Sequence, residues 1–232
     1  MKVFAISDLH LSETVDKPMS VFGAQWEGHW DRIRADWRAR VGEDDLVLIG
    51  GDISWAMTLP EALPDLASIM ELPGKKVLLR GNHDYWWPSL TKLSAALDDR
   101  TFVLQNNALR FPGLVVAGTR GWTIAPEGAS EEDRKIYLRE GQRLALSLKA
   151  AQAARQTGDR LLVHFHYPPW VRAEEPTLFT EQLEAAAPDV VLFGHLHRVR
   201  PEEVPEGELR GLRYQLVSCD YLGFVLKEIM EV

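Results

Sequence analysis

Side chains that commonly bind metal ions recur in five short motifs along this chain. Carboxylates, imidazoles and one amide dominate the motifs, a combination that suits divalent manganese, iron, zinc or cobalt. The chain has a single cysteine, Cys219, which excludes a zinc site built from several thiolates. Each motif alone is typical of an ordinary turn, so their joint placement decides what they mean. The motifs are Asp8-Leu9-His10, Gly50-Gly51-Asp52, Gly81-Asn82-His83-Asp84, His164-Phe165-His166-Tyr167-Pro168-Pro169 and Gly194-His195-Leu196-His197.

Each motif directly follows a short apolar run that is typical of a buried strand. In open α/β sheets, ligands gather outside the carboxyl ends of the strands, so the motifs are predicted to meet at one edge. The glycines of the second, third and fifth motifs are expected to let the backbone turn sharply just before a ligand. The predicted strands span residues 3–6, 46–49, 76–79, 101–104, 114–117, 161–165, 190–193, 213–217 and 223–229.

Segments whose apolar residues have helical spacing lie between these strand-like runs. This alternation of predicted helices and strands indicates an α/β fold. Strands crowd together over residues 101–117, which indicates a mixed sheet there. In the first predicted helix, Trp26, Trp30 and Trp37 fall on one face, a spacing that favours core packing over a ligand pocket. Residues 200–211, rich in Pro, Glu and Gly, are expected to form an exposed loop. The predicted helices span residues 25–41, 59–72, 88–97, 130–155 and 181–187.

The whole-chain composition favours a single soluble domain over residues 1–232. The formal net charge of −8 disfavours nucleic acid and anionic membranes as partners. No apolar stretch is long enough to span a bilayer, and the N-terminal apolar run is too short for a signal peptide. One cysteine permits no intramolecular disulfide, which favours a reducing compartment. We therefore expect a cytoplasmic protein.

The five motifs in this order resemble those of the calcineurin-like metallophosphoesterase family. That family carries D-x-H, then G-D, then G-N-H-D/E, then a histidine followed closely by proline, and finally G-H-x-H. The chain matches every block between Asp8 and His197, so the resemblance covers most of its length. The resemblance implies an α/β fold in which two mixed β-sheets pack as a sandwich flanked by helices, in four αββα layers.

The resemblance also implies two divalent metal ions and assigns their ligands. Manganese, iron, zinc and cobalt are the candidates, and manganese is expected to serve in vitro. Asp52 would bridge the two ions, which lie roughly 3.5–4 Å apart in two-metal sites. One ion would be held by Asp8, His10 and His197, and the other by Asn82, His166 and His195.

Two histidines compete for one ligand position in the fourth motif. His164 and His166 are two residues apart, so on an extended backbone they would face the same way. The family pattern places the ligand just before Tyr-Pro-Pro, which selects His166 and leaves His164 as a core or supporting residue. The alternative is that His164 binds the metal and His166 faces the substrate.

In the family, the histidine of the third motif does not bind metal, which implies a catalytic role for His83. It would protonate the leaving oxygen or stabilise charge there, and Asp84 would orient its imidazole and raise its pKa. The implied reaction is hydrolysis of a phosphomonoester or phosphodiester by hydroxide that the metals generate from water. The presence of His83 favours an enzyme over a non-catalytic binding scaffold.

Aromatic and basic residues beside the motifs are candidates for substrate binding. Trp55 follows the second motif and Tyr85 the third, so both are placed to line a cleft and stack on a flat group. Arg120 follows a predicted strand and either grips a substrate phosphate or lies on the surface. Three further aromatic residues are expected either to line the cleft or to pack in the core: Trp86, Trp87 and Trp170.

A small phosphorylated molecule is therefore the expected substrate, with a nucleotide as one candidate. A metal-dependent nuclease is the alternative within the family, but no stripe of Lys or Arg supports a nucleic-acid groove. The motifs leave open the choice of monoester or diester, the native metal and the oligomeric state.

Overall fold

Five apolar strands build a first mixed sheet in this computed structural model, which describes residues 1–123, 129–172 and 175–232. Four neighbouring strands run parallel, and the last strand of the chain joins the edge antiparallel to the first. The sheet order is β11 (Lys227–Glu231), β1 (Lys2–Ile6), β2 (Leu46–Ile49), β3 (Lys75–Leu79) and β4 (Thr101–Leu104).

A second mixed sheet begins where the chain leaves β4. The turn between β4 and β5 carries the chain from one sheet to the other, so the crowded strands at residues 101–117 are divided between the two sheets. The central strands are parallel, and each edge strand is antiparallel to its neighbour. The order is β5 (Ala108–Phe111), β6 (Leu114–Thr119), β7 (Arg160–Phe165), β8 (Val190–Phe193), β10 (Leu212–Leu216) and β9 (Gly207–Leu209).

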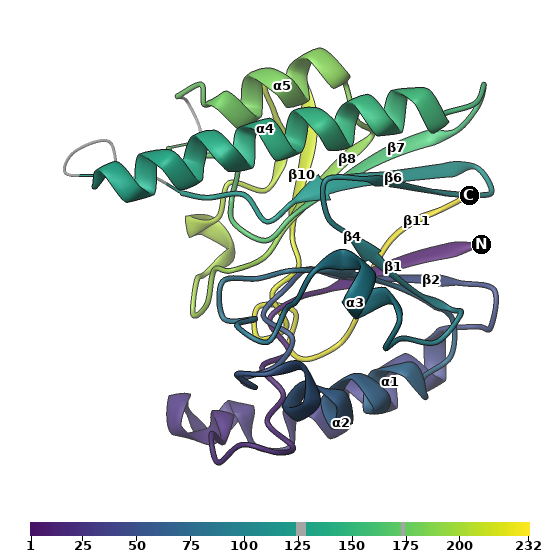
Figure 1. The fold of residues 1–232 in the computed structure, drawn as a ribbon, viewed down its shortest axis with the longest axis vertical. Helices are drawn as coiled ribbons and strands as arrows, with labels where there is room; N and C mark the ends of the chain where they lie inside the picture. Colours follow the sequence, from purple (N-terminus) through teal and green to yellow (C-terminus); the bar gives the residue numbers. More distant parts are fainter. Residues whose placement is uncertain (124–128, 173–174) are drawn as a thin grey trace.

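Helices cover the outer face of each sheet, which completes four layers (Figure 1). The first sheet is covered by α1 (His29–Arg40), α2 (Leu59–Met70) and α3 (Leu90–Ser94), and the second by α4 (Glu131–Ala154) and α5 (Leu178–Ala186). The predicted αββα sandwich is therefore confirmed. In the parts of the chain that the structure describes, no helix is long and apolar enough to cross a membrane.

Three apolar cores hold the layers together. Alternation along a strand explains them: in β1, Phe4 and Ile6 pack toward the helices, whereas Val3 and Ala5 pack toward the other sheet. Because strands of both sheets are buried on both faces, they read as continuous apolar runs rather than alternating ones. The two sheets are thus fixed face to face, and the carboxyl ends of their parallel strands lie at one edge.

The first predicted helix differs most from the structure. Its apolar spacing predicts a helix over residues 25–41, but α1 begins at His29, because Gly28 adopts a left-handed conformation with φ of 61°. Short 3₁₀ helices at Met19–Phe22 and Ala24–Trp26 precede it. Trp26 therefore leaves the helical face on which the sequence placed it.

Smaller differences have local causes. The predicted helix at residues 181–187 starts earlier, at Leu178, because the Thr177 side chain caps it by accepting a hydrogen bond from Thr180 N. The expected loop at residues 200–211 contains a 3₁₀ turn at Pro201–Glu203 and the edge strand β9.

Candidate metal centre

All five motifs meet at the carboxyl ends of strands from both sheets. The first three motifs follow β1, β2 and β3, and the last two follow β7 and β8. Their side chains form two clusters, in each of which three ligand atoms lie within 4.8 Å of one another. The first cluster is Asp8, His10 and His197, and the second is Asp52, His166 and His195.

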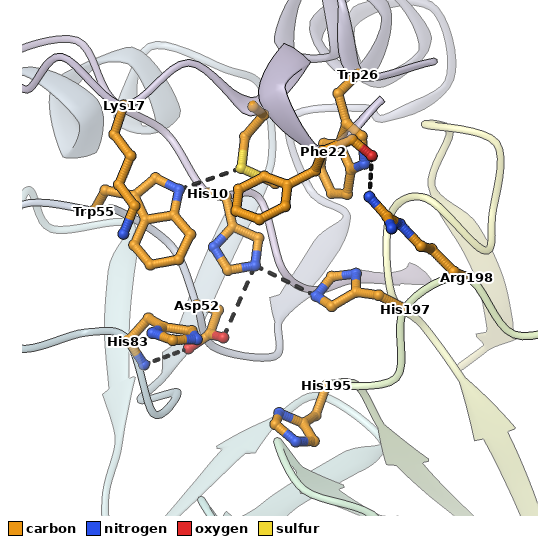
Figure 2. A pocket seen from close by; sticks show the side chains of 11 residues that line it. His10, Lys17, Phe22, Trp26, Asp52, Trp55, His83, His195, His197 and Arg198 are labelled. Atoms are coloured by element: carbon orange, nitrogen blue, oxygen red, sulfur yellow. Dashed lines mark hydrogen bonds and ion pairs between the residues drawn. The ribbon is translucent and has the colours of Figure 1, made fainter. Parts of the chain in front are cut away.

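The carboxylate of Asp52 belongs to the second cluster and also faces the first. Its Oδ2 is 3.9 Å from Nε2 of His10 and 3.5 Å from Nε2 of His166. Its Oδ1 accepts a hydrogen bond of 2.8 Å from His83 N, which fixes the plane of the carboxylate. One buried side chain therefore faces ligand atoms of both clusters. Figure 2 shows its contact with His10.

The ligand residues themselves turn the backbone. Asp8, His10, Asp52 and His195 all have positive φ, between 49° and 70°, a conformation that costs of order 1–3 kcal/mol for a residue with a side chain. The expectation that glycines make these turns holds only for Gly51, with φ of 94°. Such backbone strain is common at functional sites, where surrounding packing sustains it.

The other motif glycines are required for close approach instead. A Cβ atom added to Gly81 would overlap Oδ1 of Asp52, and one added to Gly194 would overlap the side chain of Ser7. A Cβ on Gly50 would lie 2.6 Å from Nε2 of His164. These positions let loops from neighbouring strands pack directly against one another.

Asp8 has one satisfied and one unsatisfied carboxylate oxygen. Oδ2 accepts hydrogen bonds from the Ser7 and Ser218 hydroxyls and from His195 N. Oδ1 is buried, lies 3.6 Å from Nε2 of His197, and has no hydrogen-bond partner among the described residues. Burial alone would raise the pKa of Asp8, but the surrounding imidazoles hold it well below its ordinary value. An ionised, unpaired oxygen in this position fits a bound cation.

His166 faces the second cluster with a lone pair. Its Nδ1 lies 2.9 Å from Gly50 O and must donate to that carbonyl, so Nε2 carries no proton in the neutral ring. Burial lowers the pKa of His166 to about 4, which keeps the ring neutral. Nε2 lies 2.7 Å from Oδ1 of Asn82. Two acceptor atoms thus face each other, an arrangement that a cation coordinated by both would satisfy.

His164 lies behind the clusters rather than in them. It is fully buried on β7, and burial lowers its pKa to about 3. Neither ring nitrogen has a hydrogen-bond partner in the described ranges, and the ring packs against Gly50. Of the two histidines, only His166 offers a ligand atom to a cluster.

The end of β10 contributes residues that sequence reasoning missed. Asp220 lies after this strand, and its Oδ1 accepts a hydrogen bond of 2.9 Å from Nδ1 of His197. Its Oδ2 accepts one from Arg198 N. Ser218 and Cys219 bond to Asp8 from the same turn. The available signal was another polar segment, Ser-Cys-Asp, at a predicted strand end.

Asp220 fixes which nitrogen of His197 faces the first cluster. Burial would lower the pKa of His197, but hydrogen bonding and charge from Asp220 and Asp8 raise it to about 10. Burial lowers the pKa values of His10 and His195, so these rings are neutral at neutral pH. Neutral imidazoles and carboxylates are the forms that bind metal, and His197 must release a proton to join them.

His83 lies in the cavity, but Asp84 does not orient it. Both Asp84 oxygens bond elsewhere: Oδ1 accepts from Ile53 N, Ser54 N and Trp86 Nε1, and Oδ2 accepts from Gly81 N. Burial and the charge of Lys17 lower the pKa of His83. The predicted role of Asp84 in orienting His83 and raising its pKa is therefore wrong. Asp84 instead ties the loops after β2 and β3 together.

A cavity of about 410 Å³ opens over the clusters (Figure 2). Trp55 lines it as predicted, stacking on His10 with ring centroids 4.6 Å apart. Trp26, expected only in the core, lines it as well. The remaining wall outside the clusters and His83 comes from Lys17, Met19, Phe22 and Arg198.

Other expected substrate contacts lie away from this cavity. Arg120 does not line it and pairs with the buried Glu140 at 3.3 Å. Tyr85 is 57% exposed and approaches His83 only edge-on, with ring centroids 6.4 Å apart. The aromatic rings that are buried in the cores instead are those of Trp86, Trp87 and Trp170.

Comparison with known proteins agrees with this geometry. The family profile described as Calcineurin-like phosphoesterase matches residues 1–199. No curated protein sequence gave a significant match. The fold resembles that of phosphopantetheinyl hydrolase from Mycobacterium tuberculosis, at 14% identity and a TM-score of 0.57 over 100% of this chain and 96% of that one. A protein from Thermus thermophilus is similar at 14% identity and a TM-score of 0.58, over 92% and 87% of the two chains.

The role of Asp220 can be tested by removing its charge. Asp220→Asn should weaken binding of one metal ion by roughly 10–100-fold, because the carboxylate that orients a ligating imidazole is lost. Calorimetric titration with Mn²⁺ measures this. Asp99→Asn is the control, because it removes the same charge at an exposed residue, and it should bind Mn²⁺ as the wild type does. Equal affinities in Asp220→Asn and the wild type would contradict the role.

Proposed function

The chain belongs to the calcineurin-like phosphoesterase family, and on that premise we propose that it hydrolyses a small phosphate ester with two bound divalent metal ions. The observation that carries the proposal is the carboxylate of Asp52, which faces ligand atoms of both clusters. A carboxylate has two oxygens to offer, so one residue suffices to link two ions.

Three residues are proposed to hold each ion beside Asp52. The unpaired Oδ1 of Asp8 supports a first ion, and the facing lone pairs of Asn82 and His166 support a second. The first ion would be bound by Asp8, His10 and His197, and the second by Asn82, His166 and His195. The mixed nitrogen and oxygen donors suit manganese, iron, zinc or cobalt.

Bound metals would supply Lewis acidity, which lowers the pKa of a water and neutralises charge on the phosphoryl oxygens. His83, which lines the same cavity, would act on the leaving oxygen. Because burial and Lys17 lower the pKa of His83, the neutral ring is the resting form. Its N–H would donate a hydrogen bond to the leaving oxygen as charge develops there.

The walls of the cavity favour a small-molecule substrate over nucleic acid. Aromatic and apolar side chains surround it, and the net charge of −8 opposes a polyanionic strand. The presence of His83 and the convergence of seven ligand-type side chains support an enzyme rather than a binding scaffold. We also propose a cytoplasmic location, because the single cysteine is buried and free.

Activity is the direct test of this proposal. The Mn²⁺-loaded wild type should hydrolyse a nitrophenyl phosphomonoester or a bis-nitrophenyl phosphodiester. His83→Ala should keep two metal ions per chain and lower kcat by about 10²-fold or more, because a donor to the leaving oxygen is lost. An unchanged rate in His83→Ala would contradict its role, and no turnover of either substrate with any divalent metal would contradict the proposed function.

Metal content distinguishes the two histidines of the fourth motif. His166→Ala should lower bound Mn²⁺ from two ions to about one per chain, as measured by elemental analysis after gel filtration. His164→Leu is the matched control and should retain two ions, because His164 touches neither cluster. The opposite pattern would make His164 the ligand.

A further inference from the structure

Residues 12–28, between β1 and α1, cover one flank of the cavity, and we call them the cover segment. Four of its side chains line the cavity: Lys17, Met19, Phe22 and Trp26. In Figure 2, Lys17 and Arg198 stand on opposite sides, with Phe22 and Trp26 between Trp55 and Arg198. Since no ligand of either cluster comes from the cover segment, its side chains are available to recognise the organic part of a substrate.

Contacts with three other parts of the chain hold the cover segment in place. Trp55 Nε1 donates to Met19 Sδ at 3.2 Å, and Thr14 Oγ1 donates to Glu61 O at 2.8 Å. Arg198, next to the candidate ligand His197, donates to Phe22 O. These contacts fix the position of the cover segment relative to the metal centre.

Lys17 is fixed in position without a counter-ion. Its ammonium lies 3.3 Å from the centroid of the Trp55 ring, a cation–π contact. Trp55 in turn stacks on His10, with ring planes 18° apart. In the described part of the chain, the ammonium makes no hydrogen bond and no ion pair within 4.0 Å. The N–H donors that point away from the Trp55 ring are available to a ligand.

The charges around the cavity mouth are one-sided. Outside the two clusters and His83, Lys17 and Arg198 are the charged side chains among the described lining residues, and both are cationic. The chain as a whole carries the opposite sign, with a net charge of −8. Two uncompensated cations attract a ligand with more negative charge than one scissile phosphate.

We propose that the cavity selects a phosphate ester whose leaving group is flat and apolar and carries a second anionic group. The scissile phosphate lies at the metal centre, the flat group packs against Phe22 and the edge of Trp55, and Lys17 binds the second anion, a carboxylate or a phosphate. This rests on the proposed function, because the metal centre positions the scissile phosphate. Lys17 is thus a specificity-determining residue.

A matched pair of uncleavable ligands tests this. Phenylphosphonate and 4-carboxyphenylphosphonate differ only by the second anion, and their P–C bond resists hydrolysis. Calorimetry on the Mn²⁺-loaded wild type should show about tenfold tighter binding of the carboxylated ligand, because a charge-assisted hydrogen bond is added. Lys17→Met should reduce this preference to within about twofold, whereas Lys17→Arg should keep it.

Lys135→Met is the control, since Lys135 is exposed on α4 and does not line the cavity, and it should bind as the wild type does. A wild type without preference, a preference that survives Lys17→Met, or no binding of either phosphonate would overturn the inference. Hydrolysis of phenyl phosphate or bis-nitrophenyl phosphate by the wild type tests the proposed function separately. Turnover of one of these esters together with any of the results above would contradict only the substrate selection. No turnover of either ester with any divalent metal would contradict the proposed function itself.

Discussion

The geometry around the Asp52 carboxylate depends on both sheets at once. Asp52 follows β2 of the first sheet, yet Oδ2 lies 3.5 Å from Nε2 of His166, which follows β7 of the second. The two residues meet only because the sheets pack face to face with their carboxyl strand ends at one edge. Anything that shifted one sheet against the other would separate the clusters.

Burying so many polar groups is costly unless they have partners. The protein meets part of that cost with hydrogen bonds: Asp84 to four donors, Asp8 to three, and Asp220 to two. Burial keeps most of the histidines neutral, which avoids mutual repulsion. Among the polar atoms left unsatisfied at the two clusters are Asp8 Oδ1 and the facing lone pairs of Asn82 and His166. These atoms point to cations as the missing partners.

Local order along the chain predicted the α/β alternation and the placement of the motifs at strand ends, whereas the two-sheet sandwich and the ligand assignments came from the family resemblance. A strand end places its next residue at a sheet edge, so the positions of Asp8, Asp52 and His195 followed from the apolar runs alone. Side-chain direction follows from packing instead. Arg120 forms an ion pair with Glu140, and Asp84 accepts hydrogen bonds from backbone amides. Residue spacing along the chain predicts neither interaction.

The cover segment and Asp220 escaped prediction for a related reason. Residues 12–24 have neither strand nor helix periodicity, because the 3₁₀ turns of this region are too short to show one. Trp26 was placed on a helix that begins only at His29. Asp220 lies far along the chain from His197, so only the pairing of β10 with β8 brings them together.

Anomalous diffraction from crystals grown with Mn²⁺ tests the central claim most directly. Two manganese peaks, one on each side of the Asp52 carboxylate and about 3.5–4 Å apart, are the predicted result. A single peak, or peaks that do not share Asp52, would contradict a two-metal centre built on that residue.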